Sequence, residues 1–309
     1  NSAKAKRDTL SVTNASAPLA IPAGTSANVG NVIINAGGDV SVKSSDALNV
    51  DIKTGGFAGG AAAVGAGIAV LNVDTGNTAQ VKGTGANVHG VAPRITATGS
   101  VNVKATTNHV LIGNSYAGTV GGLAAVSADV VVFKDVSRTK AFVQNQAMTV
   151  NGLTLIKADM TRNVNLRGYG AAISFGGLGA GASVTTATLG GTVDASLIGS
   201  NITATSGTGK VTVDASSDDT ADTQAIAASG GAGAALSGSG SVSKISTAVE
   251  AKIHSSVVAA SNAVEVLASA KADADSKAIG VAVAGGLRPG TFDVSLAAAP
   301  KRKPRLFHA

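Results

Sequence analysis

The chain contains no cysteine and no tryptophan, and only 3% of its 309 residues are aromatic. The absence of cysteine excludes disulfide bonds and cysteine-ligated zinc sites. It does not exclude export, because a long regular β structure needs no covalent staple. The scarcity of large side chains argues against a compact globule, whose core usually holds leucine, isoleucine and aromatic residues. The hydrophobic content is instead alanine and valine, which predicts thin layers of small side chains packed closely together.

Motifs of catalysis and nucleotide binding are also missing. The chain has no G-x-S-x-G nucleophile elbow, no G-x-x-x-x-G-K-[ST] phosphate loop, no EF-hand loop and no G-G-x-G-x-D calcium repeat. Glutamate occurs only as Glu250 and Glu265, which disfavours the acidic cleft that a polysaccharide-degrading β-helix enzyme needs. A Ser–His–Asp triad with distant partners stays open. We predict no enzyme activity, no catalytic, cofactor-binding or metal-binding residues, and no cofactor.

Two groups of polar residues are the remaining candidates for a site. No histidine has a second histidine or a carboxylate at metal-ligand spacing, so we expect all four to be surface residues: His89, His109, His254 and His308. Two acidic clusters offer the carboxylate oxygens that calcium prefers: Asp218, Asp219, Asp222, Asp273 and Asp275. Calcium binding by these clusters stays open, but we expect them to lie in solvated turns.

The net charge of +6 comes largely from the end of the chain, at Lys301, Arg302, Lys303 and Arg305. Without these four residues the charge falls to +2, so the high isoelectric point does not indicate nucleic-acid binding. The tail at 299–309 breaks the pattern of the preceding residues in composition and periodicity. We expect it to be disordered.

A short segment with alternating apolar residues recurs five times: Val40–Lys43, Val101–Lys104, Thr154–Lys157, Val211–Asp214 and Val264–Leu267. The last residues of these segments are 61, 53, 57 and 53 positions apart. Twelve residues later a glycine-rich stretch opens, at Tyr116, Tyr169, Ile226 and Ile279, with Phe57 displaced to fourteen. A valine follows 27 or 28 residues after each of the first four segments, at Val70, Val132, Val184 and Val242. A strand closes 38 to 40 residues after them, at Val81, Val143, Leu197 and Ile253. This order predicts a structural unit of about 56 residues.

Three features favour strands over helices in these units. The recurring segments alternate with a period of two residues. Glycine is spread through the apolar stretches, where each one costs a helix about 1 kcal/mol relative to alanine. The segment Ala124–Phe133 carries small and β-branched residues on both faces. We therefore expect little helix.

The expected fold is all-β, an elongated right-handed parallel β-solenoid built from imperfect repeats of about 56 residues. A coil commonly needs roughly 20–30 residues, so one repeat is expected to hold two coils. We expect an irregular N-terminal segment at 1–30, the repeat region at 31–298 and the basic tail at 299–309. Within the first segment, Leu10–Val12 and Leu19–Ile21 are predicted edge strands, because proline flanks them.

The spacing between the first two repeats is the longest, and the extra residues Gly83–Gly99 are rich in glycine. An inserted surface loop has this composition. We expect this loop to project from the surface and to contribute to recognition. The chain begins without methionine or a signal sequence, which indicates an excerpt of a longer protein.

A membrane-spanning role is less favoured than a β-solenoid. The stretch Gly55–Leu71 has 17 uncharged residues, at the lower limit for a spanning helix, but it is rich in glycine. Charged residues interrupt the corresponding stretches of the other repeats, as at Asp129, Lys134 and Lys244. A membrane strand is compatible with Ala124–Phe133, although the aromatic girdles of membrane barrels are missing.

The repeat resembles the β-strand-repeat passenger regions of large Gram-negative surface proteins, in particular the leukotoxin-type filamentous adhesin family of fusobacteria and its relatives. The resemblance covers roughly residues 31–286 and has the form A-x-A-x-(G-rich)-x-V-x-x-x-x-x-x-A-x-I. Ala225–Ala234 and Val242–Ile253 carry it in the fourth repeat. It implies export and display at the cell surface, and it carries over no catalytic residue.

The function predicted from these features is a structural or adhesive segment of a secreted or surface-displayed filamentous adhesin of a Gram-negative bacterium. A stiff rod of this kind presents loops and ladders of serine, threonine and asparagine to host glycans, to neighbouring cells or to identical rods. The alternative is a membrane-acting, leukotoxin-like toxin region, and a polysaccharide-acting β-helix protein is less favoured. No nucleic-acid partner is expected, and contact with a membrane stays open.

Overall fold

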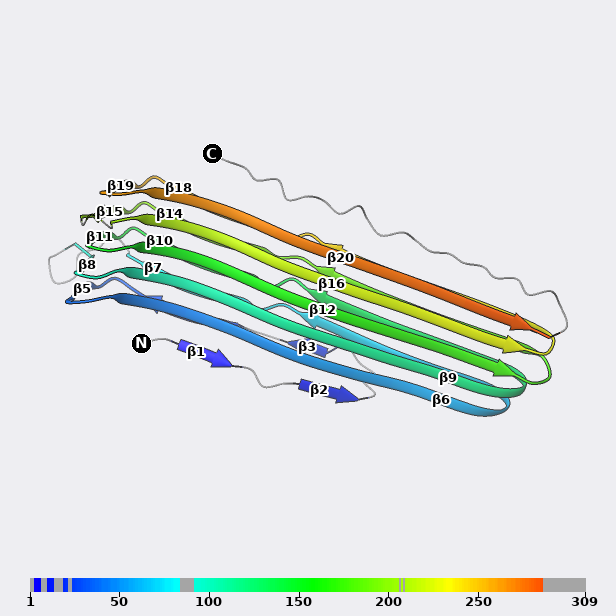
Figure 1. The fold of residues 1–309 in the computed structure, drawn as a ribbon. Coiled ribbons are helices and arrows are strands. Elements are labelled where there is room, and N and C mark those ends of the chain that lie inside the picture. The colour runs from blue at the N-terminus through cyan, green and yellow to red at the C-terminus, as the bar shows by residue number, and fades with distance from the viewer. Residues whose placement is uncertain are drawn as a thin grey trace.

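A computed structural model describes residues 24–83, 92–205, 207 and 209–285, together with the backbone of three short strands before residue 24. The described part of the chain is all-β and contains no helix (Figure 1). This confirms the expectation of little helix. All strand pairings within the described residues are parallel, and the strands form three sheets.

Two of the sheets consist of five short strands each. The second sheet contains β4 (Thr25–Val29), β7 (Gly76–Lys82), β10 (Arg138–Gln144), β14 (Thr192–Ile198) and β18 (Ala248–His254). The third sheet contains β5 (Ile33–Ala36), β8 (Arg94–Ala97), β11 (Ala147–Val150), β15 (Asn201–Ala204) and β19 (Val257–Ala260). Both sheets lie at one end of the molecule, on the left in Figure 1.

The first sheet is much longer and extends to the opposite end. Its main strands are β6 (Val40–Val73), β9 (Val101–Asp135), β12 (Thr154–Ser174), β13 (Leu178–Leu189), β16 (Val211–Gly231), β17 (Ala234–Ile245) and β20 (Val264–Ala284). Figure 1 shows the chain running out along one leg, turning at the far end and returning along a second leg. The outgoing leg comprises the first part of β6 and β9 and the strands β12, β16 and β20. The returning leg comprises the second part of β6 and β9 and the strands β13 and β17.

Three short N-terminal strands pair with the outer side of β6: β1 (Ala3–Lys6), β2 (Leu10–Thr13) and β3 (Leu19–Ile21). The second and third contain the predicted edge strands, which are therefore confirmed. The tail at 299–309 lies outside the described residues, as do residues 286–298 of the predicted repeat region.

The five alternating segments found in the sequence lie side by side. Val40 pairs with Val101, and the same row continues through Thr154, Val211 and Val264. The register also aligns the predicted closing residues Val81, Val143, Leu197 and Ile253.

The register corrects two of the other recurring positions that were aligned from the sequence. Gly55, not Phe57, lies beside Tyr116, because the irregularity in β6 falls later, between Gly60 and Ala62. Thr186, not Val184, continues the row of Val132. The expectation of two coils in each repeat is wrong, because from Thr25 onward the paired residues are 52 to 62 positions apart rather than about half that distance.

Alternation of inward and outward side chains builds two apolar clusters between the layers. One lies among the three sheets and includes Val103, Val143 and Val150. The other lies between the two legs of the long sheet and includes Leu111, Phe133 and Leu166. These residues are buried because every second side chain of a strand points to the same side.

Towards the turns of the long strands, the inward positions are occupied by small residues. A Cβ atom added to Gly170 would lie 2.2 Å from the carbonyl oxygen of Ala182, and one added to Gly56 would lie 2.0 Å from that of Ala66. The two legs are therefore too close for any side chain at these positions. The predicted thin layers of small side chains are confirmed here.

The extra residues between the first two repeats lie between β7 and β8, at the place of the predicted surface loop. Residues 84–91 of the predicted loop Gly83–Gly99 lie outside the described residues. The prediction of a loop is wrong for the last part of this range, because Arg94–Ala97 forms β8. Ile95 and Ala97 point into the core and the strand pairs with β5 and β11.

Candidate functional site

Ionisable side chains form a continuous network between the two apolar clusters. His109, Arg162 and Asp219 occupy the same row of three neighbouring strands, because His109 pairs with Arg162 and Arg162 with Asp219. Asp135 reaches this row from the end of β9, and Asp46 reaches it from β6. All five residues are at most 1% exposed.

His109 lies between two carboxylates. Its Nδ1 is 2.8 Å from Oδ2 of Asp135, and its Nε2 is 3.6 Å from Oδ2 of Asp46. Burial opposes the positive charge, but the hydrogen bond to Asp135 and the carboxylate of Asp46 outweigh it, so the pKa of His109 is raised above its ordinary value. The site therefore favours an imidazolium.

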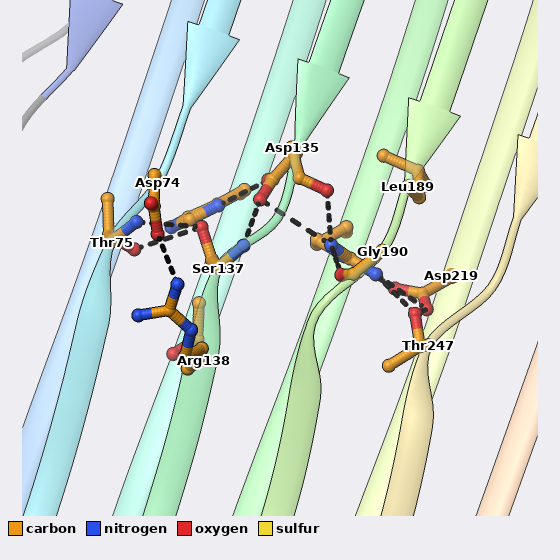
Figure 2. Close-up of polar contacts among 12 residues, drawn as sticks. Asp74, Thr75, Asp135, Ser137, Arg138, Leu189, Gly190, Asp219 and Thr247 are labelled. Carbon is orange, nitrogen blue, oxygen red and sulfur yellow. Dashed lines mark hydrogen bonds and ion pairs between the residues drawn. The ribbon is translucent and has the colours of Figure 1, made fainter.

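Arg162 is the centre of the network, and its partners Asp135, Gly190, Asp219 and Thr247 are labelled in Figure 2. Its Nε and Nη2 donate to the two carboxylate oxygens of Asp219 at 2.8 and 2.9 Å. Its Nη1 donates to the carbonyl oxygens of Gly190 at 2.7 Å and Asp135 at 3.2 Å, and lies 3.5 Å from Oδ1 of Asp135. Burial opposes the ionisation of Asp135, but His109 and Arg162 outweigh it and lower the pKa of this carboxyl.

Hydroxyl groups and backbone amides complete the coordination of the carboxylates. Ser217 donates to Asp219 at 2.8 Å, and Thr247 donates to the same oxygen at 2.5 Å. The backbone amide of Ser137 donates to Asp135 at 2.9 Å. A group that acts on a substrate must reach it, and these groups are sealed from solvent. The arrangement instead links neighbouring layers, since a shift of one strand by one residue would turn its charged side chain outward.

The sequence-based expectation for His109 is wrong, because this histidine is fully buried and paired with a carboxylate. A signal for it exists in the sequence. His109, Arg162 and Asp219 each lie six residues after an inward residue of an alternating segment, namely Val103, Ile156 and Val213. An even separation along a strand keeps a side chain on the same side. His254 is exposed as expected, whereas His89 and His308 lie outside the described residues.

The five aspartates considered for calcium do not converge. They lie in strands β16 and β20, so the expectation of turns is wrong. Asp219 belongs to the buried network, Asp218 is paired with Lys271 at 3.1 Å, and Asp222 is paired with Arg167 at 2.6 Å. Asp273 and Asp275 are exposed on the last strand. Within the described ranges, no three histidine, cysteine or acidic side chains are grouped as metal ligands.

A second buried polar layer lies closer to the turns. Thr54 donates to Ser115 at 2.7 Å, and Ser183 donates to Asp129 at 3.3 Å. Burial raises the pKa of Asp129 to about 6, against the opposing hydrogen bonds of Ser115 and Ser183. This carboxyl therefore keeps its proton to a higher pH than an exposed aspartate does.

The outer surface of the far end is apolar on both legs, which the sequence alone did not reveal. Three rows of the outgoing leg contain only apolar residues, tyrosine and glycine: Gly55, Tyr116, Tyr169, Ile226 and Ile279; Phe57, Gly118, Ala171, Ala228 and Val281; Gly59, Val120, Ile173, Gly230 and Val283. Four rows of the returning leg hold a single threonine: Val64, Val126, Ala180 and Leu236; Ala66, Ala128, Ala182 and Gly238; Ile68, Val130, Val184 and Gly240; Val70, Val132, Thr186 and Val242. We call this surface, together with the turns, the apolar end.

Several side chains of the apolar end are largely exposed. The exposed fraction is 81% for Phe57, 73% for Val64 and Phe175, and 68% for Leu123. The rings of Tyr116 and Tyr169 stack at its inner border, with centroids 5.3 Å apart. Burial of such side chains would be favourable, and exposed apolar patches of this kind are typical of interaction surfaces.

The rows that border the apolar end carry positive but no negative side chains. On the outgoing leg the bordering row is Lys53, Asn114, Arg167, Gln224 and Lys277. On the returning leg it is Asn72, Lys134, Thr188 and Lys244. The apolar end is thus framed by basic side chains on both faces.

None of the described segments is a helix long and apolar enough to cross a membrane. Comparison of the chain with protein-family models, with curated proteins and with solved structures finds no match.

Proposed function

We propose that the chain is a structural and adhesive segment of a filamentous protein that a Gram-negative bacterium secretes or displays on its surface. In this proposal the fold is a right-handed parallel β-solenoid in which one imperfect repeat of about 56 residues forms one coil. The segment is a stiff support that holds recognition surfaces away from the cell, and it performs no catalysis.

The observation that carries the proposal is the register of the parallel strands. Rows continue through up to five strands of the long sheet and recur in the two short sheets, so each layer presents the same template to the next. Stacked units of this kind stabilise one another mainly through contacts with their nearest neighbours. The buried network supports the same interpretation, because its charged groups are paired with one another across neighbouring layers.

The polar half of the outgoing leg is the surface best suited to recognition. Its outward rows hold serine, threonine and asparagine, among them Asn108, Thr161, Asn163 and Ser216, together with charged residues such as Asp218 and Lys271. Hydroxyl and amide groups in flat rows can donate and accept hydrogen bonds along a glycan. We therefore assign host or neighbouring-cell glycans as the partner class of this surface.

An attachment assay tests this function. Beads coated with the full chain are expected to attach to epithelial cells more than albumin-coated beads, and soluble chain should compete. A double variant, Thr161→Glu with Asn163→Glu, places two negative charges in the polar rows at exposed positions and should abolish the excess attachment. Lys140→Glu on β10 is the matched control, since it lowers the net charge by the same amount on another sheet.

Two results would contradict the proposal. Attachment no greater than that of albumin-coated beads would remove the adhesive role. Release of reducing ends from a polysaccharide panel would show instead that the chain is a polysaccharide-acting enzyme.

A further inference from the structure

We propose that the apolar end inserts into one leaflet of a lipid bilayer whose headgroups are anionic. This inference concerns a different surface from the polar rows and does not depend on the adhesive role. It rests on the size of the apolar end, on its distribution over both faces and on the charge of its border.

The apolar end is large for a protein of this kind. With two residues of a strand spanning about 6.6 Å and strands about 4.8 Å apart, each of its two faces covers about 500 Å². The two faces together reach about 1,000 Å², whereas the largest exposed apolar patch of a typical monomer is about 300–600 Å². An uncovered surface of this area would be unfavourable in water.

A second copy of the chain is a poorer occupant than lipid. Face-to-face packing of two copies would bury about 1,000 Å² in total, below the roughly 1,200–2,000 Å² of specific stable interfaces. It would also leave the opposite face of each copy in water. A bilayer surrounds both faces and the turns at once, including the exposed side chains of Phe57, Leu123 and Phe175.

The depth of the apolar end matches one leaflet. On the outgoing leg, the distance from Tyr116 to the turn at Leu123 is about 23 Å at 3.3 Å per residue. One leaflet contributes about 15 Å of hydrocarbon, or about 20–22 Å with its headgroup region included. The stacked tyrosines at the border then lie at the depth of the headgroups, where tyrosine is enriched in membrane proteins.

The border supplies the charge that anionic headgroups require. Lys134 and Lys244 are exposed beside the apolar rows of the returning leg and supply most of this charge. On the outgoing leg, Lys53 and Arg167 are ion-paired with Asp51 and Asp222 of the next row, at 3.3 and 2.6 Å. Long basic side chains keep their stems along apolar surface while the charged group reaches the phosphates. Two copies packed in parallel would instead bring these positive borders together.

The backbone of the inner layers also meets the requirement of a lipid environment. Strand β9 pairs with β6 on one side and with β12 and β13 on the other, and β16 pairs with β12 and β20. Their backbone groups are therefore hydrogen-bonded within the sheet. Apolar surroundings tolerate only backbone that is satisfied in this way. Among the described residues this holds for the inner layers, whereas no strand pairs with the outer edge of β6 between Lys53 and Leu71.

Flotation of the full chain with vesicles tests the inference. The chain is expected to float with vesicles of one part phosphatidylserine to three parts phosphatidylcholine, and less with phosphatidylcholine alone. Lys134→Gln and Lys244→Gln should each lower partitioning to the anionic vesicles about fivefold. A triple variant, Val64→Asp with Leu123→Asp and Phe175→Asp, should not float.

Val257→Asp is the matched control, because Val257 is 66% exposed on β19 at the opposite end of the molecule. It should float like the unmodified chain. Circular dichroism of every variant verifies that the β structure is retained, as expected for exposed positions.

A single introduced tryptophan measures the position in the bilayer directly, since the chain has none of its own. Fluorescence of Leu123→Trp should be quenched by lipids brominated on their acyl chains, and fluorescence of Val257→Trp should not. The inference is overturned if the unmodified chain stays in the lipid-free fraction, or if the triple variant floats equally well. It is also overturned if sedimentation shows a dimer that the triple variant dissociates, because a second copy would then cover the apolar end.

Discussion

Removal of the Arg162 side chain provides the sharpest test of the buried network. Arg162→Leu leaves the carboxylates of Asp135 and Asp219 without their shared cation and removes the donor to the carbonyl oxygen of Gly190. The leucine itself fits the position, because Leu48 occupies the same row in β6. The cost therefore comes from uncompensated charge and not from shape.

The magnitude follows from the composition of the network. With His109 protonated, the network has three carboxylates and two cations, so loss of Arg162 leaves three carboxylates and one cation. Breaking a buried ion pair by removing one partner costs about 3–5 kcal/mol. With a urea m-value of about 3 kcal/mol/M, the midpoint of unfolding should fall by about 1 M or slightly more.

The double variant Arg162→Leu with Asp219→Leu separates charge from packing. The double variant also removes the carboxylate of Asp219, which the single variant leaves buried without a cation. It should therefore be more stable than Arg162→Leu. Arg138→Leu is the surface control, since Arg138 pairs with Asp74 at 3.5 Å and both side chains are more than half exposed. Its loss should stay below about 1 kcal/mol.

Urea unfolding followed by circular dichroism measures these differences, with hydrogen exchange of β12 to localise them. A loss below about 1 kcal/mol for Arg162→Leu would refute the argument. A double variant that is no more stable than the single variant would also refute the argument, because removal of the unpaired buried carboxylate would then have no effect on stability.

Three further predictions concern protonation and close packing. Because the pKa of Asp129 is raised to about 6 from 3.8, the folded state holds a proton that the unfolded state releases, and stability should fall by about 3 kcal/mol as pH rises through this window. Asp129→Asn should remove this loss in denaturation measured across pH. The raised pKa of His109 stabilises the fold below 6.5, and this contribution should disappear as pH rises through the folded pKa, a dependence that His109→Leu should abolish. Gly170→Ala should destabilise the chain by about 1–3 kcal/mol by forcing Cβ against Ala182, whereas Gly230→Ala, with open space around its Cβ, should raise stability by about 0.4–1 kcal/mol; equal melting temperatures for the two would contradict the packing argument.

The strand register was largely predictable from the sequence. The alternating segments mark one strand in each repeat, and their spacing places residues as distant in sequence as Val40 and Val264 in one row. The displaced landmark at Phe57 shows the limit of this reasoning. Gly55 lies twelve residues after Lys43 and pairs with Tyr116, but glycine has no side chain that resembles tyrosine, so similarity of side chains pointed to Phe57 instead.

The buried network was predictable only in part. The inward direction of His109, Arg162 and Asp219 follows from their even distance to inward valine or isoleucine residues. The position of Asp135 does not follow, because it lies after the turn, where the alternation begins again with a phase that depends on the turn. Its pairing with His109 therefore required the folded arrangement of both legs.

The sequence by itself determined the all-β character, the spacing of the layers and the need for small side chains between them, because these depend on local periodicity and side-chain size. Only the tertiary structure decided which apolar residues face outward. A period of two places alternate residues on opposite sides of a strand but does not state which side is covered. That choice is made when the two legs pack against each other through glycine and alanine, which leaves the larger apolar side chains of both legs on the outside.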